Sequence, residues 1–138
     1  MTVHAYIDGA SRGNPGESGI GVVLKNQTGA ILESISGYIG KATNNIAEYS
    51  ALLVCLNKAI DLNCKHLIVF SDSELLVRQM NKQYRVKNEG IKKVYQHVQR
   101  VLSKSAIKFE IKHIDRERNK DADLLANAGI NNRRRIKV

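Results

Sequence analysis

Residues 43–72 read TNNIAEYSALLVCLNKAIDLNCKHLIVFSD and combine a helical pattern with the strand that follows it. Thr43 or Asn44 can cap the helix, whose end we expect near Leu62. Residues 66–71 (HLIVFS) form a nearly continuous apolar run, which is typical of a strand covered on both faces. Apolar residues recur between these points at the helical spacing of three or four: Ile46, Tyr49, Leu53, Leu56 and Ile60. The stretch therefore predicts a helix that leads into a buried strand.

Three strands are predicted before this helix. Residues 2–8 (TVHAYID) favour a strand that stops at Gly9, and residues 10–16 (ASRGNPG) are typical of a loop. Residues 19–26 and 30–39 are two further strand patterns joined by a tight turn. We interpret the three strands as an antiparallel meander. The helix then crosses over to another strand, which predicts a mixed sheet with helices packed on its faces.

Three helices and one more strand are predicted in the second half of the chain. Residues 73–82, 90–104 and 120–129 show helical patterns. Residues 107–111 alternate apolar and polar side chains, which is typical of a strand with one wet face near an edge of the sheet. The complete order is βββαβααβα, an α/β arrangement.

The composition fits one domain that attracts polyanions. At 138 residues and 43% hydrophobic content, the chain can close a single core. We expect residues 1–130 to form that domain and residues 131–138 (NNRRRIKV) to form a basic tail. Lys and Arg total 22 against 13 acidic residues, which favours nucleic acid as a partner but is weak evidence by itself.

The cysteines and the apolar runs point to a reducing compartment. Cys55 and Cys64 lack metal-ligand spacing, so we interpret them as reduced structural thiols. The first residues do not resemble a signal peptide, and no run of about 18 apolar residues predicts a membrane span. We therefore expect a cytoplasmic protein that does not enter a membrane.

Four carboxylates stand near the ends of predicted elements: Asp8, Glu48, Asp72 and Asp123. Ordinary structural roles exist for three of them, namely a turn residue for Asp8, a helix cap for Asp72 and a first-turn acid for Asp123. Glu48 is more telling, because a carboxylate on the apolar face of a helix is rarely buried unless it is paired or metal-bound. Bringing four anions together is costly unless a cation lies between them. The pattern therefore predicts a divalent metal site.

The residues around these acids form four ordered motifs. Together they resemble ribonuclease H type 1, in a compact form without a basic protrusion or a hybrid-binding domain, and the resemblance covers essentially the whole chain. It implies a five-stranded mixed sheet, built from a three-strand antiparallel meander plus two parallel strands and flanked by helices. It also implies an endoribonuclease that hydrolyses the RNA strand of RNA/DNA hybrids, leaving 5′-phosphate and 3′-hydroxyl ends. The motifs are DGASRGNPG (8–16), TNNIAE (43–48), SDSELL (71–76) and NKDADLLA (119–126).

The resemblance assigns catalytic and metal-binding roles to the four acids. Two Mg²⁺ ions, or Mn²⁺ as a substitute, would straddle the scissile phosphate in a two-metal mechanism. Asp8 would contact both ions and Asp123 would help hold the ion that activates water. Glu48 and Asp72 would hold the ion at the leaving oxygen. An all-oxygen site suits these hard ions and disfavours zinc.

The same resemblance implies how the hybrid would bind. Asn14, Asn44 and Asn45 would reach its minor groove, while Lys41 and Thr43 would hold a phosphate of the DNA strand. Recognition would rest on shape and on the 2′-hydroxyl rather than on base sequence. Each of these residues also has an ordinary turn or cap role, most clearly Thr43. We expect the protein to act as a monomer on this substrate.

The segment before the last acid departs from the family pattern. Many members carry a mobile histidine there in a glycine-rich loop, whereas residues 113–123 (HIDRERNKDAD) contain no glycine. His113 continues the alternation of the preceding strand, so we predict that it packs inward instead of acting as that histidine. Arg116 or Arg118 would then hold a phosphate. The basic tail is predicted to touch substrate phosphates, with a merely solvated end as the alternative.

Three other functions fit part of the pattern. A non-catalytic hybrid-binding module would not need all four acids. A resolvase or transposase core that cuts DNA fits poorly with the TNNIAE and GNPG segments. A structural domain would explain the basic surface but not an acid on an apolar helix face.

Overall fold

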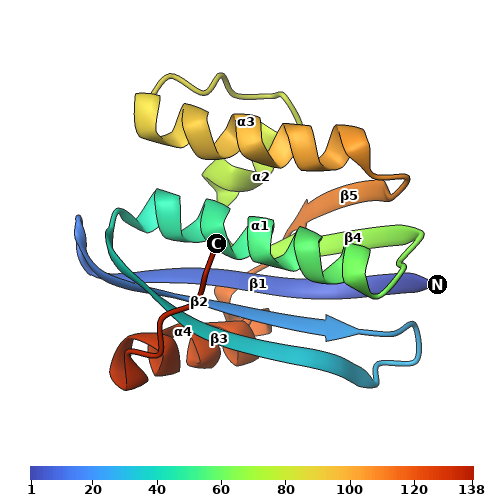
Figure 1. Cartoon of the computed structure of the whole chain (residues 1–138), viewed down its shortest axis with the longest axis horizontal. Coiled ribbons are helices and arrows are strands. Elements are labelled where there is room, and N and C mark those ends of the chain that lie inside the picture. Colours follow the sequence, from blue (N-terminus) through green and yellow to red (C-terminus); the bar gives the residue numbers. More distant parts are fainter.

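The computed structural model describes all residues, 1–138, and contains one five-stranded sheet with helices on both faces (Figure 1). The strands are β1 (Thr2–Gly13), β2 (Gly16–Lys25), β3 (Ile31–Ala42), β4 (His66–Ser71) and β5 (Lys108–His113). The helices are α1 (Asn44–Asp61), α2 (Glu74–Met80), α3 (Glu89–Lys104) and α4 (Lys120–Asn132), with a 3₁₀ turn, η1 (Arg116–Arg118), before α4.

The strand order is β3-β2-β1-β4-β5. β1, β2 and β3 pair antiparallel as a meander, and β4 pairs parallel with both β1 and β5. This confirms the predicted mixed sheet. The parallel pairs require crossovers, which α1 supplies between β3 and β4 and which α2 and α3 supply between β4 and β5.

The main core lies between the sheet and α1. Figure 1 shows α1, α2 and α3 on one side of the sheet and α4 on the other. α1 is buried over most of its length because the sheet covers one side and α3 covers another. Each fully buried Leu or Ile in such a core stabilises the fold by about 1.5–3 kcal/mol relative to an exposed side chain. Side chains with no exposed surface there include Val3, Ala5, Ile7, Leu52, Cys55 and Leu56.

The predicted ends of α1 are confirmed. Thr43 is the N-cap, and its hydroxyl oxygen accepts a hydrogen bond from the Ile46 N–H at 3.2 Å. Leu62 is the C-cap. A cap of this kind satisfies a backbone donor that the first turn of a helix leaves free.

The prediction of a loop at residues 10–16 is wrong. β1 continues past Asp8 to Gly13 and β2 begins at Gly16, so only Asn14 and Pro15 form the turn. The peptide bond between these two residues is cis. The sequence hides this hairpin because it extends beyond the core, where serine and glycine replace the apolar alternation that marks a strand.

Side-chain bonds hold this extension to its neighbours. The hydroxyls of Ser11 and Ser18 are 2.6 Å apart, and Ser18 also donates to the carbonyl oxygen of Ala42 at 3.1 Å. The hairpin is thereby tied to the end of β3. It lies beside the start of α1, where two of the acidic motifs meet.

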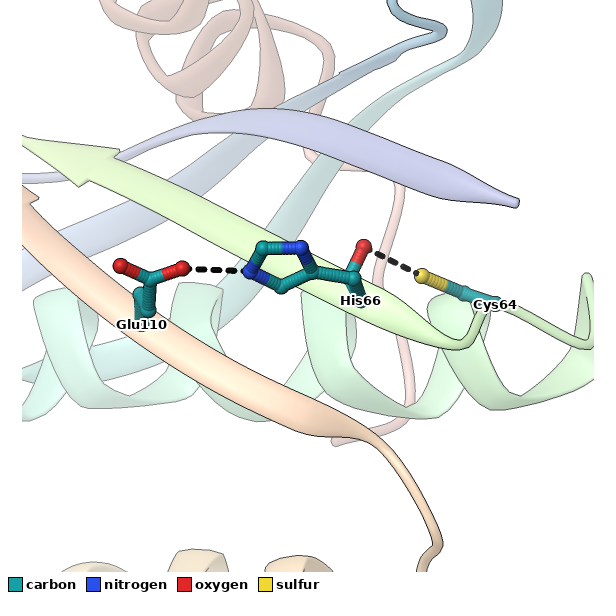
Figure 2. Close-up of polar contacts among 3 residues, drawn as sticks. All are labelled: Cys64, His66 and Glu110. Carbon is teal, nitrogen blue, oxygen red and sulfur yellow. Dashed lines mark hydrogen bonds and ion pairs between the residues drawn. The ribbon is translucent and has the colours of Figure 1, made fainter.

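β5 is an edge strand with one wet face, as its alternation predicted. Figure 2 shows how Glu110 of β5 pairs with the His66 ring of β4, while the Cys64 thiol donates to the His66 carbonyl oxygen at 3.1 Å. The bond from His66 lowers the pKa of Glu110. Cys64 and Cys55 are both free and buried, and burial raises the pKa of each thiol, so neither is a reactive thiolate.

The last helix is longer than expected, since α4 continues three residues past Gly129 to Asn132. Gly129 lies against the backbone of Gly37 in β3, so this glycine serves close packing and does not end the helix. No helix in the structure combines the length and apolar character needed to cross a bilayer.

Candidate active site

The fold brings the four acids together at one end of β1 and β4. Asp8, Glu48 and Asp72 each offer a carboxylate oxygen within 4.8 Å of the others. Asp123 lines the same hollow, which has a volume of about 170 Å³ and also borders Asn44, Arg116 and the residues after Asp8. The acids come from four separate elements: β1, α1, the residue after β4, and the first turn of α4.

Glu48 is held by a close approach of α1 to β1. Its Oε2 accepts a hydrogen bond from the Gly9 N–H at 3.1 Å, and Glu48 is 4% exposed. A β-carbon on Gly9 would lie 2.4 Å from the backbone nitrogen of Glu48, so any side chain there would push the helix away. Glycine after Asp8 is therefore required to place the two acids side by side.

A second close approach places Asp123. Asp8 pairs with Gly21 across β1 and β2, and α4 packs directly over Gly21. A β-carbon there would lie 2.0 Å from the carbonyl oxygen of Ala122, the residue before Asp123. The absence of a side chain on β2 thus lets the start of α4 reach the acids.

Asp72 does not serve as a helix cap. Ser73 is the N-cap of α2 and accepts from the Leu76 N–H at 3.2 Å, while the Ser71 hydroxyl accepts from the Ser73 N–H. The structural alternative for Asp72 is therefore wrong, and its carboxylate points to the acid cluster. Asp123 does lie in the first turn of α4, as its structural alternative predicted, and it also lines the acid hollow.

The cluster is electrostatically unfavourable without a cation. Burial raises the pKa of Asp8 from 3.8 to about 8, and the charges of Asp72 and Asp123 add to the rise. Burial and the neighbouring Asp8 also hold the pKa of Glu48 well above its usual range. Near neutral pH the cluster therefore retains protons that a bound metal ion would displace. A buried, all-oxygen, anionic donor set fits hard divalent ions.

Sequence reasoning assigned no role to Asn119, although it begins the fourth motif. The side chain is 1% exposed, and its Nδ2 donates to the Ile7 carbonyl oxygen at 2.8 Å and to Asp72 Oδ2 at 3.5 Å. Its backbone oxygen accepts from the Asp123 N–H at 3.1 Å. One buried amide thus connects the strand of Asp8, the carboxylate of Asp72 and the helix of Asp123. The only sequence signal was a polar residue four positions before an acid.

The predicted substrate residues surround the start of α1. Asn14 Oδ1 accepts from the Asn44 N–H at 3.0 Å, which ties the turn of the hairpin to the helix. Asn44 borders the acid hollow, whereas Thr43 is occupied as the cap. Asn45 is half-buried in the first turn of α1, and Lys41 is exposed near the end of β3. Four of the five therefore gather around the start of α1, with Lys41 just before it, and Asn44 alone borders the acid hollow.

The three residues before the last helix separate in space. Arg116 borders the acid hollow, while Arg118 lies in a different hollow with Tyr6 and Lys25. His113 is exposed, so the prediction that it packs inward is wrong. His113 is the last residue of the edge strand β5, beyond the buried Ile111, and it borders a groove with Glu74 and Arg78 of α2.

Comparisons with known proteins support this arrangement. A family model described as "Reverse transcriptase-like" matches residues 6–129. Ribonuclease HI of Halobacterium salinarum is 36% identical over 128 residues, which cover 93% of this chain and 64% of that protein. A bifunctional protein of Mycobacterium tuberculosis is 38% identical over 92% of this chain but only 35% of its own length. The chain thus spans less than two thirds of either relative.

Solved structures match over almost their whole length. LC11-RNase H1, isolated from compost and solved in complex with an RNA/DNA hybrid, has a TM-score of 0.92 and 37% identity. The match covers 95% of this chain and 98% of that one. RNase H1 from Halobacterium salinarum has a TM-score of 0.91 and 34% identity, and the match covers 96% of this chain and 99% of that one.

The sheet order and the acid cluster define an α/β domain of the ribonuclease H-like class. The family match over residues 6–129 and the near-complete structural matches narrow this class further. The chain belongs to the type 1 ribonuclease H family.

Proposed function

We propose that this protein is an endoribonuclease that hydrolyses the RNA strand of RNA/DNA hybrids and leaves 5′-phosphate and 3′-hydroxyl ends. The observation that carries the proposal is the cluster of Asp8, Glu48 and Asp72, whose carboxylate oxygens lie within 4.8 Å of one another in a basic protein. Its net charge of +9 draws in a polyanion, and the acid cluster is the site within this basic protein that would bind cations. The hybrid bound to LC11-RNase H1 supports the choice of substrate.

The four acids are proposed to hold two Mg²⁺ ions, with Mn²⁺ as a substitute. Asp8 would serve both ions, Asp123 would help hold the ion that activates water, and Glu48 and Asp72 would help hold the ion that stabilises the leaving oxygen. Divalent ions bound there supply a stronger nucleophile and stabilise negative charge at the reacting phosphate. The protein's own part is to fix the carboxylates, through the Gly9 N–H on Glu48 and the Asn119 amide beside Asp72.

Asn14, Asn44 and Asn45 are proposed to contact the minor groove, because short amides in the β1–β2 turn and at the start of α1 can both donate and accept there. Lys41 and Thr43 are proposed to hold a phosphate of the DNA strand. Arg116 borders the acids and is proposed to contact a phosphate near the cut; Arg118 faces another hollow and is a weaker candidate. A monomeric state and a cytoplasmic location stay predictions.

Cleavage of matched duplexes tests the proposal. A hybrid, a duplex DNA and a duplex RNA of one sequence, each labelled at the 5′ end of one strand, are incubated with Mg²⁺, with Mn²⁺ or with EDTA. We expect the RNA strand of the hybrid to be cut only with metal, and both homoduplexes to stay intact. Cleavage of duplex DNA would indicate a resolvase-like nuclease, and tight hybrid binding without cleavage would indicate a binding module. Either result would overturn the proposal.

A further inference from the structure

The C-terminal segment after α4 is attached to the sheet. The Tyr38 N–H donates to the Arg134 carbonyl oxygen at 2.8 Å, and the Ile136 N–H donates to the Tyr38 carbonyl oxygen at 3.0 Å. Ile136 packs at Gly37 and contacts the hydrophobic core. Figure 1 shows this segment running from the end of α4 past β3. The basic tail is therefore an ordered part of the fold, and its arginines have defined positions.

Four side chains meet at the β3 edge of the sheet, and we call them the edge cluster: Glu17, Tyr38, Arg133 and Arg135. The Tyr38 hydroxyl donates to Glu17 Oε2, and Arg133 Nη1 lies 3.2 Å from the same oxygen. The guanidinium groups of Arg133 and Arg135 lie 5.7 Å and 5.2 Å from the centre of the Tyr38 ring. Both arginines are thus held by a cation–π contact.

The two arginines differ in how their charge is balanced. Arg133 forms an ion pair with Glu17, whereas no acidic side chain lies within ion-pair distance of Arg135. Arg135 is exposed, so its donors remain available to an outside acceptor. A guanidinium fixed on an aromatic ring, with free donors and no acid beside it, is well suited to bind a phosphate.

The position of Arg135 links it to the proposed DNA-strand site. A β-carbon on Gly40 would lie 3.1 Å from Arg135 Nη2, so the guanidinium is next to the residue that precedes Lys41. β3 ends one residue after Lys41, and Thr43 then caps α1. Along this edge, Arg135, Lys41 and Thr43 follow one another toward the acids. This order matches the path of a nucleic-acid strand that runs from the acid cluster over the edge of β3.

We propose that Arg135 binds a second phosphate of the DNA strand, adjacent to the phosphate proposed for Lys41. The inference rests on the proposed function, because it assumes that the partner is a hybrid. It adds a contact from the C-terminal segment: Arg133 is paired with Glu17, and Arg135 remains free to bind the nucleic acid. Arg134 carries the same charge in the same segment but lies at a hollow with Ser36, Gly129 and Asn132, away from Lys41.

Hybrid binding as a function of salt tests this assignment. Arg135→Gln and the matched control Arg134→Gln are each combined with Asp8→Asn, so that the substrate stays intact. One lost phosphate contact makes the slope of log affinity against log salt shallower by about 0.9. We expect that change, with several-fold weaker binding at low salt, for Arg135→Gln and not for Arg134→Gln. Arg135→Lys should retain the slope, because it keeps the charge while losing the flat stacking surface.

Replacing one phosphate of the hybrid by an uncharged methylphosphonate identifies which nucleic-acid strand Arg135 contacts. Hybrids are prepared with one methylphosphonate at successive positions of the DNA strand. At one of these positions the substitution should weaken hybrid binding by the parent chain but should not weaken binding by Arg135→Gln any further. Equal behaviour of Arg135→Gln and Arg134→Gln, or a matching position on the RNA strand, would overturn the inference. A lower melting temperature for Arg135→Gln with an unchanged slope would also overturn it, because Arg135 would then only brace Tyr38. These outcomes are distinct from a failure of the proposed function, in which the parent chain itself would not cut hybrids.

Discussion

The acid cluster and the edge cluster arrange charge in opposite ways. Asp8 and Glu48 are buried beside like charges, and no cationic side chain forms an ion pair with either of them. In the edge cluster, by contrast, the lone acid Glu17 is half-buried and meets Arg133 and the Tyr38 hydroxyl. The first cluster is incomplete until cations arrive from solution, whereas in the second the only acid already has a cationic partner within the chain. Removing an acidic charge should therefore stabilise the fold at the acid cluster and destabilise it slightly at the edge cluster.

The largest effect is expected from Asp8→Asn. The amide keeps the shape of the side chain but removes a charge that the metal ions require, so the rate of hybrid cleavage should fall by orders of magnitude. The melting temperature in EDTA should stay the same or rise, because repulsion from Asp72 and Asp123 is relieved. Steady-state cleavage and thermal denaturation measure the two effects.

Asp115→Asn is the matched control for this substitution. Asp115 is exposed and makes no capping hydrogen bond, so neither activity nor melting should change appreciably. A melting temperature several degrees lower for Asp8→Asn in EDTA would contradict the view of a self-repelling cluster.

The same cluster should make the metal-free protein less stable as pH rises. The pKa of Asp8 is raised from 3.8 to about 8, so between these values the folded chain keeps a proton that the unfolded chain has released. Stability from this group is complete below about pH 4 and is lost as pH rises through about 8. Melting in EDTA at pH 5.5, 7 and 8.5 should show a decline that is smaller in Asp8→Asn. Equal declines in both proteins would show that Asp8 does not carry the effect.

Asn119→Ala should disturb the acid cluster without removing any of its charges. Loss of the bonds to Ile7 and Asp72 should lower the free energy of unfolding by about 1–3 kcal/mol, since buried acceptors lose their donor. The loosened Asp72 should also bind Mg²⁺ less tightly. The rise in melting temperature on adding Mg²⁺ should therefore be smaller than in the parent chain. Asn132→Ala, at the exposed end of α4, is the control, and an identical Mg²⁺ response in both variants would rule out a positioning role for Asn119.

The smallest effect is expected from Glu17→Gln in the edge cluster. The substitution removes the partner of Arg133, but exposed ion pairs contribute little, so the melting temperature should fall by a few degrees at most. Hybrid cleavage should persist, because no acid of the active site is touched. A rise in melting temperature would put Glu17 in the same class as Asp8 and would remove the contrast between the clusters.

The sequence was informative wherever one local signal dominated. The spacing in residues 43–72 predicted α1 with both caps and the strand β4, although β4 buries only alternate side chains and is not covered on both faces as expected. It failed at residues 10–13 and 16–18, where strands extend beyond the core and pair through serine and backbone bonds. It also misplaced His113, because the alternation of side chains continues to the last residue of β5, which is exposed at the edge of the sheet.

By itself, the sequence determined the order of elements, the mixed sheet, the family resemblance and the four acids, because periodicity and short motifs are properties of neighbouring residues. Only the tertiary structure decided how those acids meet, through the missing side chains of Gly9 and Gly21 and through the buried amide of Asn119. It also decided which tail arginine is neutralised and which remains free, since Glu17 and Arg133 are more than a hundred positions apart in the chain. Contacts between such distant residues depend on how the layers pack, and no local pattern encodes them.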